Sequence, residues 1–456
     1  MKYLKIIIPV LFLVFVSGMN VSAQNADNKD VRIIAESFLD SYFREHSRKI
    51  ESLTLHGSDE RPLIYIVNLD PEGWLLISGN KGALPVFGFN YTGSFTFPDF
   101  NKSNPAYNWL EQSAEQLEEL YLDPADRIDP HWVEGYEYDP AKSDLTVLPL
   151  ISAEWGQGTG WNQLCPEDLA GPDGHALVGC VAVAMAQALS VYELPESGLG
   201  EKSYDHFVYG TISTDYSQSA YRWDLMSDYT ANEYSAKLLY DCATSVEMNF
   251  GPDASSATTS RAIAAFETHF SMSESMQYLY RESYDVNQWE AMIRNELKYG
   301  RPIILRGRSD DGESGHAFNV DGVVDNSYFH INWGWYGNSN GYFFLHELNP
   351  GTRSYNRSQA AILGIRPNST SIESIHSFGE LNIFPNPAYS EIRLNLESTD
   401  QLSHLRIYSL SGTMIKSFEV NSTGEGVDVS DLSKGIYIIE AVLTNKRSIR
   451  KKLIKQ

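Results

Sequence analysis

The sequence predicts an α+β protein made of three successive units. In the long central segment, helical patterns precede strand-like runs instead of alternating with them, which argues against a parallel sheet with crossover helices. A Pro- and Asp-rich stretch and a Ser- and Thr-rich stretch bound that segment, and the last part of the chain carries only short alternating strands. The predicted units are residues 24–140, 141–367 and 381–456, with a linker at 368–380.

Composition sets the broad class of protein. The chain has 456 residues, of which 42% are hydrophobic and 12% aromatic, as in folded globular proteins. Its formal charge is −24 at pH 7. A nucleic-acid partner requires a basic face, so we expect no binding to nucleic acid.

Residues 1–23 have the pattern of a secretory signal peptide. Lys2 and Lys5 precede an apolar run at 6–16, and the small residues at 21–23 suit a cleavage site. No later stretch is long and apolar enough to span a bilayer. We therefore expect a secreted protein or one held at the outer cell surface.

The N-terminal unit (residues 24–140) should be a small α+β unit. Apolar positions at helical spacing predict helices over 31–43 and 108–122. The apolar runs at 63–69 and 74–78 are joined by Asp-Pro-Glu-Gly, which predicts a hairpin.

The central unit (residues 141–367) has helices first and strands later. Helices are expected over 232–248, 260–269 and 286–299, in addition to one beginning at Cys180, and strands over 302–306, 316–324, 328–333 and 342–345. The C-terminal unit (residues 381–456) has short strands, such as 391–396, 405–408 and 436–442, separated by Gly and Asn turns, and predicts a β-sandwich.

Cys180 is the strongest candidate for a reactive residue. It follows Gly179 and opens an apolar run to Gln187 that predicts a buried helix, so the thiol lies in the first helical turn. The positive end of a helix lowers the pKa of a thiol and makes it a nucleophile. The chain also contains Cys165 and Cys242. The alternative is a Cys165–Cys180 disulfide with a structural role only.

A nucleophilic thiol needs a base and a group that orients the base. His175 lies close to Cys180 in the sequence, but so short a connection makes the required geometry difficult. His316 follows a glycine at the start of a predicted core strand and suits the role better. The amide of Asn332, on the next strand, can accept a hydrogen bond from the ring of the base, and Trp333 can shield that bond from water.

Acyl transfer also needs a hydrogen-bond donor for the developing oxyanion. Gln157 is flanked by two glycines and precedes Cys180, so its side-chain amide could act together with the backbone N–H of Cys180. The order Gln, Cys, His, Asn is that of papain-like peptidases.

Beyond these single residues, the central unit resembles the streptopain family of cysteine peptidases over most of residues 145–366. The matching motifs are Trp155-x-Gln157, Cys165-Pro166, Gly179-Cys180-Val181-Ala182, Asn249-Phe250-Gly251-Pro252-Asp253, Gly300-Arg301-Pro302, Gly315-His316-Ala317-Phe318 and Asn332-Trp333-Gly334-Trp335. The resemblance implies a papain-like fold, endopeptidase activity on protein or peptide substrates, and a Cys180–His316 pair. It also implies an oxyanion glutamine at Gln157 and an Asn-Trp pair at Asn332 and Trp333. No group of His or Cys residues in the sequence has the spacing of metal ligands, so we expect no metal site, and we expect no other cofactor.

The flanking units carry resemblances of their own. Residues 30–122 resemble the prodomain of the same family, especially at 73–78, which implies a zymogen whose N-terminal unit inhibits the site until it is cleaved within 123–147. The motifs at 383–387, 407–412 and 431–437, with the basic tail, resemble a sorting domain read by the type IX secretion machinery. A carbohydrate-binding module is the alternative for this unit.

The sequence therefore predicts a secreted cysteine endopeptidase that works through an acyl-enzyme. Two alternatives stay open: an acyl transferase that uses the same thiol, and a surface interaction protein on an inactive peptidase scaffold. The chain departs from the family in a charged loop before His316, with Arg306 and Arg308 followed by three acidic residues, and this leaves subsite preference open.

Overall fold

The computed structural model describes residues 24–43, 48–96, 105–121, 128–137, 145–308, 315–345, 359–368, 381–386, 388–396, 402–409, 414–419, 426–443 and 448–455. The predicted signal peptide and most of the predicted linker lie outside the described residues, as do the acidic residues of the loop before His316. Among the described residues, no helix combines the length and the apolar character needed to cross a membrane.

The N-terminal unit is an antiparallel sheet with helices on both sides. Its elements are α1 (Asn28–Tyr42), β1 (Lys49–Ser58), β2 (Arg61–Asp70), β3 (Trp74–Ser78), β4 (Val86–Asn90), α2 (Pro105–Leu120) and α3 (His131–Glu134). The predicted hairpin is confirmed, because β2 and β3 pair antiparallel from Ile64↔Ser78 to Asn68↔Trp74. Helix α1 begins at a capping box, in which the Asp27 side chain accepts from the Asp30 N–H and the Asp30 side chain accepts from the Asp27 N–H.

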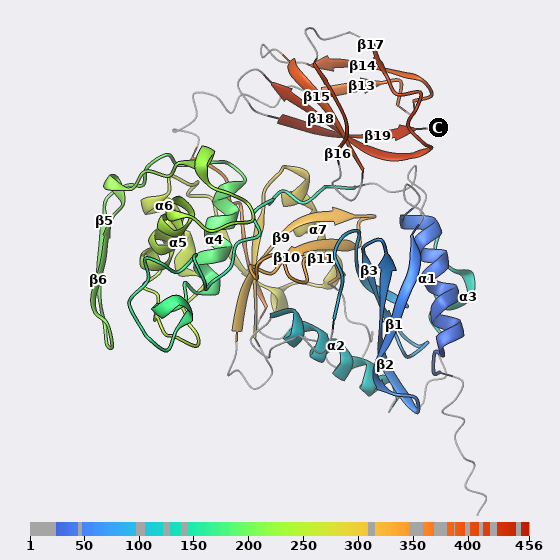
Figure 1. Ribbon diagram of the computed structural model, residues 1–456, viewed down its shortest axis with the longest axis horizontal. Helices are drawn as coiled ribbons and strands as arrows, with labels where there is room; N and C mark the ends of the chain where they lie inside the picture. The colour runs from blue at the N-terminus through green and yellow to red at the C-terminus, as the bar shows by residue number, and fades with distance from the viewer. Residues whose placement is uncertain are drawn as a thin grey trace, which may run out of the picture.

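The central unit places its helices before most of its strands, as predicted. Its elements are α4 (Cys180–Ser190), β5 (Glu201–His206), β6 (Gly210–Asp215), α5 (Glu233–Ser245), α6 (Arg261–His269), β7 (Gln277–Tyr280), α7 (Val286–Lys298), β8 (Ile303–Arg308), β9 (Gly315–Val324), β10 (Tyr328–Asn332), β11 (Gly341–Phe344) and β12 (Ala360–Leu363). Figure 1 shows α4, α5 and α6 grouped on one side of the sheet, with the β5–β6 hairpin at the outer edge.

The two units share one ten-stranded sheet, in the order β1-β2-β3-β4-β11-β10-β9-β8-β12-β7. The junction is the antiparallel pairing of β4 with β11, in which Tyr342 lies opposite Phe89 and Phe343 opposite Gly88. A side chain at Gly88 would meet the ring of Phe343, since an added Cβ would lie 3.1 Å from it. The sequence did not predict this continuous sheet.

Helices cover both faces of the shared sheet. Helix α4 packs with α5, α6, Ile304 and Ala317 in one core. Helices α2 and α7 pack against Val320, Ile331 and Phe343 in another, so a helix of the N-terminal unit lies directly on strands of the central unit (Figure 1).

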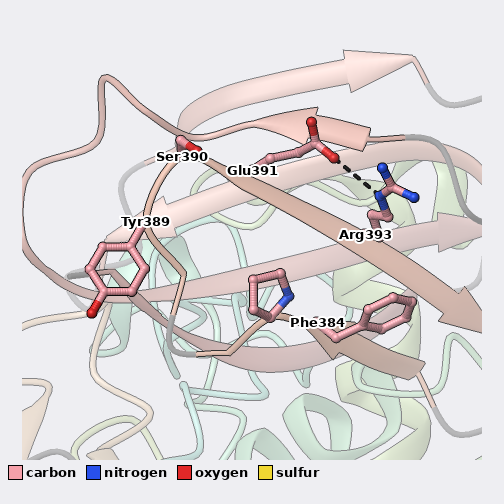
Figure 2. A pocket seen from close by; sticks show the side chains of 6 residues that line it. Phe384, Tyr389, Ser390, Glu391 and Arg393 are labelled. Carbon is pink, nitrogen blue, oxygen red and sulfur yellow. Dashed lines mark hydrogen bonds and ion pairs between the residues drawn. The ribbon is translucent and has the colours of Figure 1, made fainter.

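The C-terminal unit is a β-sandwich. Its strands are β13 (Leu381–Phe384), β14 (Glu391–Leu396), β15 (Leu402–Ser409), β16 (Met414–Glu419), β17 (Gly426–Asp428), β18 (Gly435–Leu443) and β19 (Ser448–Lys455). They form one sheet of order β13-β14-β17 and another of order β16-β15-β18-β19. Alternate side chains such as Ile392, Leu405 and Ile439 form the core between them. A shallow surface pocket on this unit holds the Glu391–Arg393 ion pair (Figure 2).

Candidate active site

Cys180 is the first residue of α4, and Gly179 is its N-cap, as the sequence predicts. Gly179 has φ 94°, in the region that favours glycine, and an added Cβ would lie 2.6 Å from the sulfur of Met248. The helix is buried on all sides from Val181 to Leu189. A helix apolar around its whole circumference belongs in a core, and this one holds the thiol at a fixed point of the central unit.

Three buried amide side chains fix α4 against the sheet. Gln187 donates to the carbonyl of Ala153 (2.8 Å) and to Oδ1 of Asn332 (3.1 Å). Asn319 of β9 donates to the carbonyl of Ala184 (3.2 Å) and to Oε1 of Gln187 (3.1 Å). Because buried amides are costly to leave unpaired, these bonds fix the position of α4 relative to β9.

This register brings Cys180 to the start of β9. The backbone N–H groups of Ala317, of Val181 and of Cys180 itself lie close enough to the thiol to act on its pKa. Ala317 is the residue after His316, so the candidate nucleophile and base come from adjoining segments. The pKa of Cys180 is nevertheless raised, because burial outweighs the three N–H groups. The N–H groups at the start of the helix act in the expected direction, but the net shift of the pKa is upward.

His316 is anchored through one ring nitrogen. Its Nε2 lies 2.8 Å from the carbonyl oxygen of Trp333, and because a carbonyl only accepts, this bond requires a proton on Nε2. In the neutral ring Nδ1 is then free of hydrogen and can accept a proton. Burial lowers the pKa of His316 to about 4, although the carbonyl acts in the opposite direction. Both shifts favour a neutral thiol and a neutral imidazole over the ion pair at pH 7.

Asn332 does not orient the base, and this part of the sequence prediction is wrong. Its Oδ1 accepts from Gln187 and from the Gly334 N–H (3.1 Å), and its Nδ2 donates to the carbonyl of Ala153 (3.0 Å). The side chain points toward α4 because it completes the buried amide cluster. The neighbouring backbone supplies the carbonyl that holds His316.

Trp333 is held firmly enough to make that carbonyl a fixed point. Its N–H donates to Oδ1 of Asn340 (3.0 Å) and its ring N–H to the carbonyl of Ser339 (2.9 Å). The ring packs 4.8 Å from that of Phe318, which in turn stacks on His316 at 6.0 Å between ring centroids. The predicted proximity of Trp333 to the base is thus found, through its backbone and this aromatic row.

Gln157 lies in the loop before α4 and is 8% exposed. Its carbonyl accepts from the N–H of Val178 (2.9 Å), two residues before Cys180. The next residue, Gly158, donates its N–H to the phenol oxygen of Tyr336 (2.8 Å). The structure therefore brings Gln157 beside the start of α4, as expected, and adds Tyr336, which sequence reasoning missed. The paired glycines around Gln157 were the available signal.

The disulfide alternative is contradicted, because Cys165, Cys180 and Cys242 are all free. Burial raises the pKa of Cys165, which makes it an inert thiol. His175 is bonded through Nδ1 to the carbonyl of Cys165 (2.8 Å), so it serves the loop that precedes α4. The described residues contain no cluster of His, Cys, Asp or Glu able to hold a metal ion.

The N-terminal unit contacts the aromatic row from outside. Trp109 of α2 lies 4.7 Å from Phe343 and 6.5 Å from Trp333, between ring centroids. An element of the N-terminal unit thus touches the residue whose carbonyl orients His316.

Comparison with known families identifies two parts of the chain. Residues 155–343 match the model of the peptidase C10 family, and residues 382–456 match that of a secretion system C-terminal sorting domain. The chain carries a streptopain-family C10 peptidase domain. The family of this domain is one of cysteine peptidases. The sorting domain directs the protein out of the cell or to its outer surface.

Relatives extend the likeness beyond the C10 domain. Streptopain of Streptococcus pyogenes is 28% identical over 354 residues, which are 70% of this chain and 84% of that protein. The thiol protease/hemagglutinin PrtT of Porphyromonas gingivalis is 30% identical over 345 residues, which are 69% of this chain but only 38% of that protein. The structure of a Prevotella intermedia prointerpain A fragment, a Cys-to-Ala variant, matches with a TM-score of 0.56 and 27% identity, covering 69% of this chain and 98% of the fragment.

Proposed function

We propose that this C10 domain is a cysteine endopeptidase that is made as a zymogen and acts on proteins or peptides outside the cell. The observation that carries the proposal is the position of the Cys180 thiol, at the start of α4 and against the Ala317 N–H beside His316. The proposed site combines a nucleophile, a base whose Nδ1 can accept a proton and a fixed carbonyl that orients the base, and the bond of His316 to Trp333 supports the last two parts.

In the proposed reaction, Nδ1 of His316 takes the proton of Cys180 and the thiolate attacks the carbonyl carbon of a peptide bond. The oxyanion accepts hydrogen bonds from the Gln157 side chain and the Cys180 N–H. His316 returns the proton to the leaving amine as the C–N bond breaks. Water, deprotonated by His316, then releases the acyl group and regenerates the thiol. No step needs a cofactor.

We further propose that residues 24–140 are an inhibitory prodomain of the peptidase unit (residues 141–367). The pairing of β4 with β11 and the contacts of Trp109 with Phe343 and Trp333 support this role. The two neutral groups at the site fit a latent form, since desolvation disfavours the ion pair. The remaining partner would be the secretion machinery, through the C-terminal unit at 381–456.

The proposal is tested by comparing secreted wild type with Cys180→Ala and Cys165→Ala. We expect Cys180→Ala to stay unprocessed, to leave casein intact and to resist a thiol-reactive epoxide. Cys165→Ala removes a buried thiol away from the site and should mature, cleave casein and take up the epoxide. N-terminal sequencing of each product reports whether processing depends on Cys180. Self-processing and casein cleavage by Cys180→Ala would refute the proposal.

A further inference from the structure

We propose that Tyr336 is a positioning residue that holds the oxyanion loop in place through its phenol oxygen. The inference rests on the proposed role of Gln157 as an oxyanion donor. Tyr336 lies in the turn after β10, whereas Gln157 lies in the loop before α4, so the contact joins two segments that are far apart in the sequence.

The phenol oxygen of Tyr336 accepts a hydrogen bond from the N–H of Gly158, which lies 2.8 Å away. The backbone of Tyr336 adds a second bond, from its N–H to the carbonyl of Trp155 (3.3 Å). Tyr336 therefore binds the backbone on both sides of Gln157.

The loop is shaped to receive this ring. A Cβ at Gly156 would lie 2.2 Å from the ring of Tyr336, and one at Gly158 would lie 2.8 Å from its oxygen. Contacts that close are sterically forbidden, so glycine on both sides of Gln157 is what allows the phenol to reach the backbone.

The backbone of Tyr336 also departs from its preferred conformation. Its φ is 58°, in the left-handed region that non-glycine residues rarely adopt. The turn holds this conformation through the bonds of Trp333 to Asn340 and Ser339. Tyr336 is 38% exposed, so burial is a weak reason for a tyrosine at this position. A strained residue kept in an active-site turn is better explained by the contact that it makes.

The consequence is that the peptide group between Gln157 and Gly158 is held at both ends. Tyr336 accepts from its N–H, on Gly158, and Val178, two residues before Cys180, donates to its carbonyl, on Gln157. The side-chain amide can then point to the oxyanion without moving the loop, which is the preorganisation that stabilises a transition state. Loss of the phenol oxygen should weaken transition-state binding while leaving substrate binding largely unchanged.

The first experiment measures kcat and KM of processed wild type, Tyr336→Phe and Tyr192→Phe on a peptide substrate. We expect Tyr336→Phe to lower kcat about tenfold, less than loss of a direct donor, with KM nearly unchanged. Its affinity for a peptide aldehyde, which forms a tetrahedral adduct with the thiol, should fall in parallel. Tyr192→Phe also removes a bonded hydroxyl, here one that donates to Ile365 (2.6 Å), and should keep both values. An unchanged kcat in Tyr336→Phe overturns the inference.

The second experiment asks whether Tyr336 acts through Gln157. If it does, adding Tyr336→Phe to Gln157→Ala should change kcat little beyond Gln157→Ala alone. Full additivity of the two losses overturns the positioning role but keeps Gln157 as a donor. An unchanged kcat in Gln157→Ala overturns both the donor role and the inference.

The variant Tyr336→Gly distinguishes a loss of kcat caused by the missing phenol from one caused by misfolding. Glycine relieves the positive φ and opens the turn, so the melting temperature should stay the same or rise while kcat still falls. A folded Tyr336→Gly variant with full kcat overturns the inference as well.

Discussion

Nε2 of His316 lies 2.8 Å from the carbonyl oxygen of Trp333, so a backbone atom orients the candidate base. A backbone carbonyl cannot be removed by substitution of its side chain, and the ring and N–H of Trp333 fix where it points. The amide of Asn332, one residue earlier, is thereby free to bind α4 instead. Because Trp333 orients the base and Asn332 binds α4, mutations of the two residues should have different effects.

Asn332→Ala should impair stability more than chemistry. The substitution leaves the Gly334 N–H and one amide N–H of Gln187 without their acceptor, and each buried unpaired group costs about 1–3 kcal/mol. Urea unfolding should show this loss, whereas the pH dependence of kcat in the remaining folded enzyme should match wild type. Trp333→Phe, which keeps the carbonyl but loses the ring bond to Ser339, should instead alter the pH dependence. A shifted pH profile in Asn332→Ala would mean that its amide does reach His316.

The lowered pKa of His316 predicts a loss of stability in weak acid. An unfolded histidine binds a proton near pH 6.5, but the folded one does so only near pH 4. As the pH falls through this window, the unfolded state binds more protons and gains stability, by at most about 3 kcal/mol. Urea unfolding of the full-length chain at pH 7 and pH 4.5 should show this decrease, and His316→Gln should reduce it. Equal pH slopes for the two proteins would contradict the prediction.

The raised pKa of Cys180 predicts slow alkylation of the full-length chain at neutral pH. Only the thiolate reacts, so the rate with iodoacetamide should rise mainly above pH 9, the ordinary value for the thiol. Removal of the N-terminal unit admits water and should move the rise to lower pH. The measurement needs the Cys165→Ala background and mass spectrometry to assign the label to Cys180. Identical profiles before and after processing would show that the N-terminal unit does not control the thiol.

Trp109→Ala should weaken the latent state. It removes the ring that lies 4.7 Å from Phe343 and leaves apolar surface of the sheet uncovered. Truncation of a large buried or half-buried aromatic residue costs up to a few kcal/mol, so α2 should leave the sheet more easily and self-processing should be faster. Glu118→Ala, which removes an exposed ion pair of α2 with Arg61 (3.7 Å), is the matched control and should process at the wild-type rate. Unchanged processing of Trp109→Ala would remove α2 from the account of latency.

Local patterns in the sequence predicted the elements better than the contacts between them. The apolar run after Gly179 predicted α4, because an apolar segment that is too long for an ordinary strand and lacks Gly and Pro indicates a buried helix. The role of Asn332 was wrong because both neighbours, Asn332 and Trp333, fit the pattern of an orienting group, and only the direction of each side chain distinguishes them. Tyr336 was missed because its partner is a backbone 178 residues away, and a backbone partner leaves no pattern of side chains in the sequence.

Gly307 should control which residues the site accepts next to His316. The two residues lie opposite each other in the β8–β9 pairing, and side chains of opposed residues share one face of a sheet. Within the described part of the chain, no heavy atom lies within 4 Å of an added Cβ at Gly307, so the missing side chain leaves open space beside the base. Because His316 protonates the leaving amine in the proposed reaction, this space should receive the residue that follows the cleaved bond.

Gly307→Val should therefore fold normally and keep its reaction with the epoxide. It should lower kcat/KM more for peptides with a large residue after the cleaved bond than for peptides with glycine there. Gly307→Ala is the matched control, because its smaller side chain should cause a smaller loss. Gly300→Val is unsuitable as a control, because Gly300 has φ 67°, a conformation that valine rarely adopts. Equal losses for both peptides would place the leaving side of the substrate elsewhere.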